Sequence, residues 1–349
     1  MSAVAELLTH SCDTDRGIHR IRRGKGFSYL HHDGTPIDDV EALARIKALV
    51  IPPAWTDVWI CLDRNGHIQA TGRDAKGRKQ YIYHPEWRAH REELKFSELV
   101  AFGDSLVRLR RRVDADMRSP QLGLERVVAT TVWLLDNTLI RVGNDEYVRS
   151  GESFGLTTLR DGHIKINGAE LRFRFNGKAG KPHDVVIHDR RVANIVRRCR
   201  DLPGQRLLQY VDGDEIKSIG SRDVNAYLGL VTSSGFTAKT FRTWGASMIA
   251  FGYLRRVDPP SSAREYDRQR NQAIRMASEH LHNTPAVCRR SYVHPAIIDD
   301  DRELFDKLLT KSNADTARSS KWMDADERAM LQFLKAADRQ KARAAARAA

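Results

Sequence analysis

The sequence predicts an α+β fold in two parts: a small β-rich N-terminal domain over residues 1–88, and a larger, mainly α-helical domain over residues 89–349 that contains a small antiparallel β-meander. Three observations support this prediction. Short β-prone runs separated by turn residues fill the chain up to about residue 88. After Trp87 the apolar residues adopt helical spacing, and between residues 156 and 188 short β-prone runs return.

The β-rich domain is expected to contain one helix and four strands, which lie at residues 27–30, 58–62, 68–71 and 80–83. Asn65-Gly66 lies between the second and third strands and is typical of a two-residue hairpin turn. The helix is expected from Asp39 to Leu49, because Pro52 and Pro53 follow it. The face expected to be buried consists of Val40, Leu43, Ile46 and Val50.

The helical domain is predicted from apolar side chains that repeat every three or four residues. Its first stripe is Leu124, Val128, Val132, Leu135 and Leu139, and Gly143 follows where a C-terminal cap is expected. Further helices are expected near Arg190 and over residues 221–231, 237–254 and 263–281. The buried stripe of the helix over residues 237–254 is expected to be Phe241, Trp244, Met248 and Phe251. Strands of the meander are expected at residues 156–159, 164–166, 171–175 and 185–187.

The net charge indicates a polyanionic partner. The chain has 58 Lys and Arg against 45 Asp and Glu, a formal charge of +13. An excess of this size in a folded chain favours nucleic acid. The C-terminal residues 335–349 are rich in Ala and Arg, which favours an exposed helix that frays or contacts a phosphate backbone.

Other classes of function are excluded by what the sequence lacks. No window approaches 18 consecutive apolar residues and no signal peptide is recognisable, so we expect a cytoplasmic protein, nucleoid-associated if bacterial, with no membrane partner. The cysteines form no C-x-x-C pair, and His280 and His282 have no partner at metal-ligand spacing, so no metal is expected. Neither Gly24-Lys25-Gly26 nor Gly177-Lys178-Ala179 completes a nucleotide-phosphate loop, so no cofactor is expected.

Five candidate catalytic residues lie in loops or at the ends of predicted elements of the helical domain, where functional groups are often held. They are Arg141, Lys178, Arg242, Asn283 and Tyr292. In their surroundings they resemble the type IB DNA topoisomerases, specifically the compact poxvirus-like and bacterial branch. The similar segments are residues 140–147 (IRVGNDEY), 175–178 (FNGK), 239–245 (KTFRTWG) and 282–285 (HNTP), with Tyr292 nine residues after Asn283. The resemblance extends to about residue 310.

The resemblance implies that the two domains close around double-stranded DNA and that the helical domain is catalytic. Tyr292 would attack a phosphodiester to give a 3′-phosphotyrosyl intermediate, the broken strand would rotate, and the 5′-hydroxyl would attack back without ATP or metal. Arg141 and Arg242 would contact the non-bridging oxygens, because a guanidinium presents a planar fork. Lys178 would be the general acid for the leaving oxygen, with Lys181 as the local alternative.

Asn283 departs from the poxviral and eukaryotic members of the family, which have His at this position. An amide can donate a hydrogen bond to a non-bridging oxygen but supplies no charge. His282 is the alternative, although the Thr284-Pro285 register favours Asn283.

The resemblance also implies DNA-binding residues outside the catalytic group. Lys239 would contact a phosphate or relay a proton, and Tyr147 would hydrogen-bond a neighbouring phosphate. In the β-rich domain the segment over residues 76–83 looks like the DNA-facing segment of the family: its basic turn suits phosphates, and its Gln and Tyr side chains suit the major groove. Its predicted DNA-binding residues are Arg78, Lys79, Gln80, Tyr81 and Tyr83. The alternative is an exposed basic hairpin with one Tyr in the core.

Two rival classes remain open at this point. Tyrosine recombinases share the Arg-Lys-Arg-Tyr chemistry, but they usually have His where Lys239 stands and lack the β-rich segment. A non-catalytic DNA-architectural protein would need only the positive charge and the basic C-terminal residues. A monomer is the expected state, because a clamp that acts at one strand needs no second copy.

Overall fold

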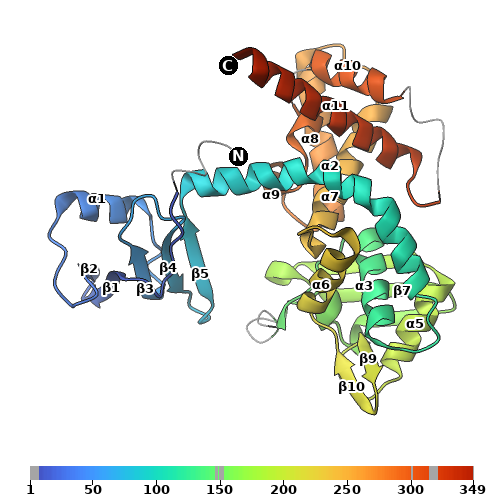
Figure 1. Ribbon diagram of the computed structural model, residues 1–349, viewed down its shortest axis with the longest axis horizontal. Coiled ribbons are helices and arrows are strands. Elements are labelled where there is room, and N and C mark those ends of the chain that lie inside the picture. The colour runs from blue at the N-terminus through green and yellow to red at the C-terminus, as the bar shows by residue number, and fades with distance from the viewer. Residues whose placement is uncertain (1–7, 146–147, 149–152, 300–301, 314–320, 349) are drawn as a thin grey trace. The chain divides into compact units, whose positions relative to one another are not determined.

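A five-stranded antiparallel sheet forms the N-terminal unit, residues 1–94 (Figure 1). The computed structural model describes residues 8–145, 148, 153–299, 302–313 and 321–348. The sheet has the strand order β2-β1-β3-β4-β5, and one helix, α1 (Val40–Ala48), follows β2 in the chain. The strands are β1 (Gly17–Arg23), β2 (Gly26–Leu30), β3 (Thr56–Cys61), β4 (Ile68–Arg73) and β5 (Lys79–Tyr83).

The predicted buried face of the first helix is only partly right. Ile46 is buried in the small core with Ile18, Val58 and Ile60. Val40 and Val50, by contrast, are 78% and 80% exposed. Val50 lies beyond the end of α1 with a φ of 49°, so it has left the helical register on which the prediction relied.

One strand of this unit was missed and one predicted turn is wrong. Strand β1 was not predicted, because basic rather than apolar residues alternate along it. One of them, Arg20, donates to the backbone carbonyls of Pro52 and Trp55. The two-residue hairpin at Asn65-Gly66 is wrong, since residues 62–67 connect β3 and β4. Gly66 does not adopt a positive φ, and a Cβ there would lie 2.6 Å from Cys61 Sγ, so close packing requires this glycine.

The second unit, residues 95–349, is mainly helical. Its helices are α2 (Pro85–Asp116, which begins in the first unit), α3 (Leu124–Thr138), α5 (Arg190–Arg200), α6 (Ser221–Thr232), α7 (Ala238–Arg256), α8 (Ala263–His280), α9 (Pro285–Ser291), α10 (Arg302–Asn313) and α11 (Ala325–Ala348). A three-stranded antiparallel sheet comprises β6 (Ile164–Asn167), β7 (Glu170–Asn176) and β8 (Pro182–His188). The hairpin β9 (Gln209–Asp212) and β10 (Glu215–Ser218) projects at the lower end of Figure 1. The predicted α+β fold class is confirmed.

Helix α7 is central to the core of this unit, because it packs against α3, α6, α8 and α11. Phe241, Trp244 and Phe251 are buried as predicted, whereas Met248 is half-buried. The stripe on α3 is also buried except for Leu124, which is 38% exposed at the start of the helix.

Two predictions around α3 are wrong. Gly143 is not the C-terminal cap, since α3 ends at Thr138 and its C-cap residue is Leu139, which adopts the left-handed conformation with a φ of 54°. Residues 156–159 do not form a strand; Leu156–Thr158 is a turn of 3₁₀-helix. The amides of Leu156 and Thr157 donate to Arg141 O and Val142 O, at 2.9 and 2.7 Å, and so this segment braces the one after α3 instead of joining the sheet.

The C-terminal helix α11 has a packed part and an exposed part. Its first turns contribute Met330, Phe333 and Leu334 to the core. Residues 338–347 are exposed, so the predicted exposed helix is present but begins three residues later than expected. Across the parts of the chain that the structure describes, no helix combines the length and the apolar character needed to cross a membrane.

Candidate active site

Arg141 follows α3 on a short segment outside helices and strands, and two glycines shape this segment. Gly143 has a φ of 99°, which favours glycine. A Cβ on Gly155 would lie 2.5 Å from both Arg141 O and Gly143 N, so no larger residue fits without moving the arginine segment. The only local sequence signal for this role of Gly155 is its place directly before a run of Leu and Thr.

Arg242 lies one turn into α7 and is only 3% exposed. Its Nη1 donates to Leu139 O at the end of α3, and its Nη2 donates to Leu281 O, 2.9 Å away, at the end of α8. Burial, followed by the nearby charge of Arg141, lowers the pKa of the Arg242 guanidinium to about 10. The group therefore remains a cation at neutral pH, held by the ends of two helices.

Asn283 lies beside Arg141, with 2.8 Å between Arg141 Nη2 and Asn283 Oδ1. His282, directly before Asn283, adopts the left-handed backbone conformation with a φ of 49°. The Asn283 Nδ2 atom is buried and has no hydrogen-bond partner among the described residues. An amide donor of this kind can donate to a phosphate oxygen.

Tyr292 is the C-cap residue of α9, and its half-buried ring lies against Arg242, whose Cζ is 5.2 Å from the ring centroid. Its backbone is fixed at both ends, because its amide donates to Cys288 O at 3.0 Å and its carbonyl accepts from Ser247 Oγ at 3.2 Å. The structure thus brings Arg141, Arg242, Asn283 and Tyr292 together from segments that are far apart in the sequence.

The electrostatic environment favours ionisation of Tyr292. Burial opposes ionisation, but the charges of Arg242, Arg141 and Lys239 outweigh it and lower the pKa of the Tyr292 hydroxyl below its ordinary value. Tyr227 and Tyr266 differ in this respect, because burial raises the pKa of each of these hydroxyls. Of these three tyrosines, Tyr292 therefore has the environment that most favours the phenolate.

Lys178 is exposed in the loop that joins β7 and β8. The loop closes on itself, since Gly177 N donates to Lys181 O at 2.8 Å and Gly180 N donates to Gly177 O at 3.0 Å. Its base lies near the site, because the ring of His183 is 4.0 Å from that of His282. Lys239 is exposed in the first turn of α7, and Tyr147 lies outside the described residues.

The predicted DNA-facing residues of the N-terminal unit lie on both faces of strand β5 and in the turn before it. Tyr81 and Tyr83 are 43% and 36% exposed, and their rings stack with centroids 5.9 Å apart. Lys79 forms an ion pair of 2.5 Å with Asp13. Arg78 and Gln80 both donate to Asp74, and Gln80 lies on the opposite face of the strand from the two tyrosines. Neither tyrosine is in the core.

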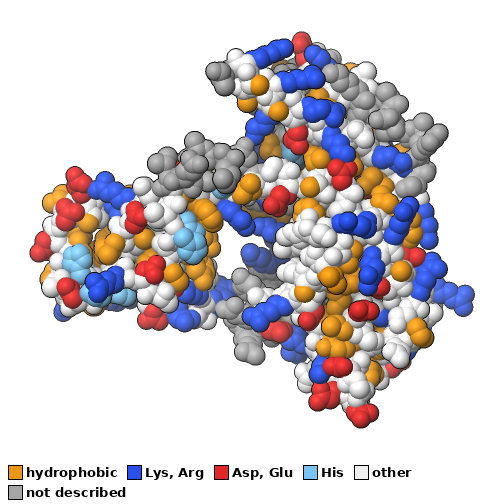
Figure 2. Space-filling model, viewed as in Figure 1, with side chains coloured by type: hydrophobic (Ala, Val, Ile, Leu, Met, Phe, Trp, Pro, Cys, Tyr) orange, Lys and Arg blue, Asp and Glu red, His pale blue; other side chains and the backbone are white. Residues whose placement is uncertain are grey.

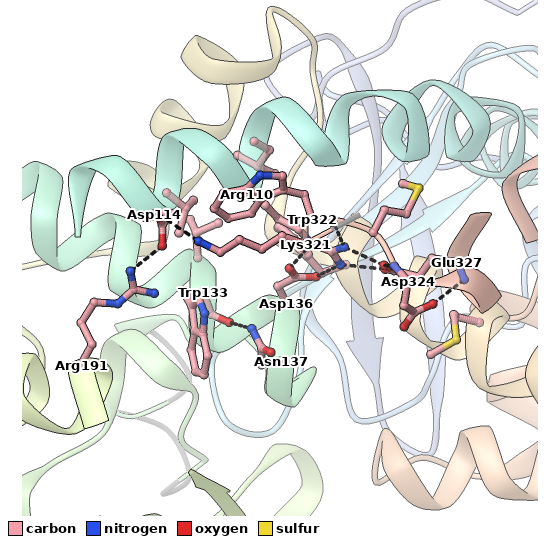
Figure 3. A pocket seen from close by; sticks show the side chains of 16 residues that line it. Arg110, Asp114, Trp133, Asp136, Asn137, Arg191, Lys321, Trp322, Asp324 and Glu327 are labelled. Carbon is pink, nitrogen blue, oxygen red and sulfur yellow. Dashed lines mark hydrogen bonds and ion pairs between the residues drawn. The ribbon is translucent and has the colours of Figure 1, made fainter. Parts of the chain in front are cut away.

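A cavity of about 510 Å³ lies elsewhere in the helical unit (Figure 3). There Arg110 of α2 bridges Asp136 of α3 and Glu327 of α11, with 2.7 Å to each carboxylate, and joins the three helices. Of the candidate site residues that the structure describes, none lines this cavity. No group of three or more His, Cys, Asp or Glu suited to a metal ion occurs among the described residues either.

Lys and Arg side chains are scattered over the visible face of each unit, with Asp and Glu among them (Figure 2). Together with the buried Arg242, the half-buried Arg141 and a tyrosine of lowered pKa, this charge suits phosphoryl transfer on a nucleic acid.

Comparisons with known proteins agree with this class. Residues 84–315 match the family model of the eukaryotic DNA topoisomerase I catalytic core, and residues 26–74 match that of the bacterial DNA topoisomerase IB N-terminal domain. The DNA topoisomerase 1B of Acanthamoeba polyphaga mimivirus is 33% identical over 79% of this chain and 85% of that protein. The DNA topoisomerase 1B of vaccinia virus (strain Western Reserve) is 22% identical over 80% of this chain and 88% of that protein.

The chain belongs to the type IB DNA topoisomerases, which are isomerases that act on DNA. The resemblance inferred from the four motifs is confirmed. These matches favour neither the tyrosine recombinase nor the architectural protein.

The free amide donor of Asn283 leads to a first prediction. Asn283→Ala is expected to slow strand cleavage about 10²-fold, or about 3 kcal/mol, because an oxyanion donor is lost. Asn283→His is expected to be tolerated, since an imidazole can accept from Arg141 and donate to the phosphate. Single-turnover cleavage of a defined duplex measures both effects. If His282→Ala proves more damaging than Asn283→Ala, the role belongs to His282.

A second prediction concerns the ionisation of Tyr292 in the DNA-free protein. The Cζ resonance of ¹³C-labelled Tyr292 is expected to titrate below the ordinary tyrosine pKa of about 10. Lys239→Gln should raise this pKa, because one of the cations that favour the phenolate is removed. Lys165→Gln, on β6, is the matched control and should leave the titration unchanged. A pKa of Tyr292 at or above the ordinary value would contradict the electrostatic argument.

Proposed function

We propose that this enzyme relaxes supercoiled duplex DNA through a covalent bond between Tyr292 and a 3′-phosphate, without ATP or metal. The single observation that carries the proposal is the contact of the Tyr292 ring with the buried guanidinium of Arg242, in a setting that lowers the pKa of the tyrosine. We further propose that it acts as a monomer in the cytoplasm, at the nucleoid if the source is bacterial.

In the cleavage step, the Tyr292 hydroxyl loses its proton, its oxygen bonds to phosphorus, and the bond from phosphorus to the 5′-oxygen breaks. Ionising a phenol of ordinary pKa costs on the order of 4 kcal/mol at pH 7. The cations beside Tyr292 reduce this cost. Bond energy is retained in the phosphotyrosyl ester, so the free 5′-hydroxyl can attack back after the strand has rotated, and no ATP is consumed.

The transition state places additional negative charge on the non-bridging oxygens. We assign its stabilisation to Arg141 and Arg242, whose charges are fixed by Asn283 and by the ends of α3 and α8. Asn283 would add a neutral donor through its free Nδ2. Lys239 and Tyr147 would contact neighbouring phosphates.

The leaving 5′-alkoxide needs a proton, because the pKa of its conjugate acid is comparable to that of water, about 15.7. We assign this role to Lys178, which is exposed on its loop and can reach a bound strand. In the N-terminal unit, the exposed rings of Tyr81 and Tyr83 and the basic side chains of Arg78 and Lys79 are proposed to bind the duplex, with Gln80 released from Asp74 to reach a base edge.

Incubation with supercoiled plasmid in EDTA and without nucleotide tests the proposal. Relaxation through a ladder of topoisomers, with a protein–DNA adduct trapped on denaturation, is expected. An adduct that maps to the 5′-phosphate, or a requirement for a divalent cation, would refute the mechanism.

A third prediction tests Lys178 as the general acid. Replacing the bridging 5′-oxygen of the scissile phosphate with sulfur provides a thiolate of pKa about 8.5, which leaves without a proton. Lys178→Ala is therefore expected to cleave ordinary DNA about 10²–10⁴-fold more slowly and the sulfur-bridged strand at nearly the wild-type rate. An equal defect on both strands would make Lys178 a phosphate contact, and Lys181 or Lys239 would become the candidate acid.

A further inference from the structure

His183 is a buried side chain next to the site, and the mechanism above does not use it. It lies on β8, is 4% exposed, and stacks between two rings. Its ring centroid is 4.7 Å from that of Phe175, with 19° between the planes, and 4.0 Å from that of His282. The imidazole therefore contacts both the meander and the segment that carries Asn283.

The same ring also contacts the loop that carries Lys178. His183 Nδ1 is 3.0 Å from Lys181 O, and because a carbonyl can only accept, Nδ1 must carry the hydrogen. Gly177 approaches the ring so closely that a Cβ would lie 2.3 Å from His183 Cε1. Both ends of the loop thus contact one imidazole: Gly177 packs against the ring, and Lys181 accepts a hydrogen bond from it.

His282 connects this stack to the residues that hold the phosphate. It lies between Leu281, whose carbonyl accepts from Arg242, and Asn283, whose side chain accepts from Arg141. Its backbone is left-handed, and its ring contacts that of His183 on the meander. The loop of Lys178 and the segment of Asn283 come from different parts of the chain, and the two histidine rings are where they meet.

We propose that His183 is a positioning residue that sets the Lys178 loop against the His282–Asn283 segment, so that the general acid reaches the leaving oxygen. The inference rests on the proposed role of Lys178. A neutral ring suits this position, since Arg141 and Arg242 lie nearby; burial, followed by the charges of His282 and these arginines, lowers the pKa of His183 to about 4. A displacement of about 1 Å can slow a reaction about 10²-fold, so loss of the contacts that position the Lys178 loop is expected to slow cleavage.

The test compares His183→Ala with Lys178→Ala and the double variant, each on ordinary and sulfur-bridged DNA. His183→Ala is expected to cleave ordinary DNA about 10²-fold more slowly. It is expected to cleave the sulfur-bridged strand within a few-fold of wild type, because that strand needs no acid. The double variant should be no slower than Lys178→Ala alone, since both changes remove the same contribution.

His163→Ala is the matched control. His163 also lies next to the meander and contacts Phe154 and Phe175, with centroids 4.3 and 6.4 Å away, but its Nδ1 accepts from Arg160 N instead of contacting the Lys178 loop. Any defect of His163→Ala should be equal on the two substrates and should multiply with that of Lys178→Ala.

Equal slowing of His183→Ala on both substrates, or effects that multiply in the double variant, would overturn the proposal and make His183 a core residue. If His183→Ala does not fold, His183→Phe keeps a stacked aromatic ring, slightly larger than the imidazole, and removes the hydrogen bond to Lys181 O. His183→Phe should also be slow on ordinary DNA and close to wild type on the sulfur-bridged strand. Equal slowing of His183→Phe on both substrates would overturn the proposal. If Lys178→Ala itself is not relieved by sulfur, the general-acid assignment fails, and the double variant alone decides whether His183 acts through Lys178.

Discussion

Tyr292→Phe is expected to abolish the covalent DNA adduct and plasmid relaxation, while non-covalent DNA binding stays within a few-fold of wild type. Only the attacking oxygen is lost, because the phenyl ring can keep its contact with Arg242 and the backbone of Tyr292 is held by Cys288 and Ser247. The adduct is measured by denaturing electrophoresis on a labelled duplex, and binding is measured by a gel shift.

Tyr266→Phe is the matched control for this change. The Tyr266 hydroxyl donates to Asp299 O at 2.9 Å, and burial raises its pKa, so a structural role is expected. This variant should lose some stability and keep the adduct. A phosphotyrosyl peptide centred on any tyrosine other than Tyr292 would refute the assignment of the nucleophile.

The elements that were predicted correctly are those whose signals are local. The apolar stripes of α3 and α7 and the strands predicted over residues 164–166, 171–175 and 185–187 depend on residues a few positions apart, and the structure confirms these elements. Strand β1 was not predicted, because Arg20 donates to the backbone carbonyls of residues 52 and 55. A search for alternating apolar residues does not reveal hydrogen bonds of this kind. Residues 156–159 have β-prone side chains, yet their amides pair with the segment after α3.

The candidate site shows the same division between local and distant information. Short motifs identified Arg141, Arg242, Asn283 and Tyr292, because each stands in a recognisable run of neighbours. The contact of Arg141 with Asn283 spans 142 positions, and no local pattern predicts it. His183 was not predicted as a site residue, because its proposed role depends on its contact with His282, which lies about 100 positions away after α8. The glycine at position 177 was the only local sign of a close approach.

Arg242→Lys is expected to slow cleavage by three orders of magnitude or more, the range in which loss of a phosphate-facing arginine commonly falls, about 10³–10⁵-fold. The guanidinium reaches Leu139 O, Leu281 O and the ring of Tyr292 at once. An ammonium is a compact charge with no planar fork, so it cannot span the two carbonyls and also face the phosphate. The defect should be equal on ordinary and sulfur-bridged DNA, because the charge on the non-bridging oxygens does not depend on the leaving group.

Arg256→Lys on the same helix is the control for this substitution, since Arg256 pairs with Asp326 near the end of α7, on a side chain that is 65% exposed. It should cleave both substrates within a few-fold of wild type. Single-turnover cleavage rates and thermal unfolding of both variants separate a catalytic loss from a loss of stability. If Arg242→Lys were relieved by sulfur, Arg242 would assist the leaving group instead of the non-bridging oxygens. If Arg242→Lys cleaved at the wild-type rate, the hydrogen bonds of the Arg242 guanidinium to the ends of α3 and α8 would have only a structural role. Arg141 alone would then stabilise the charge of the transition state.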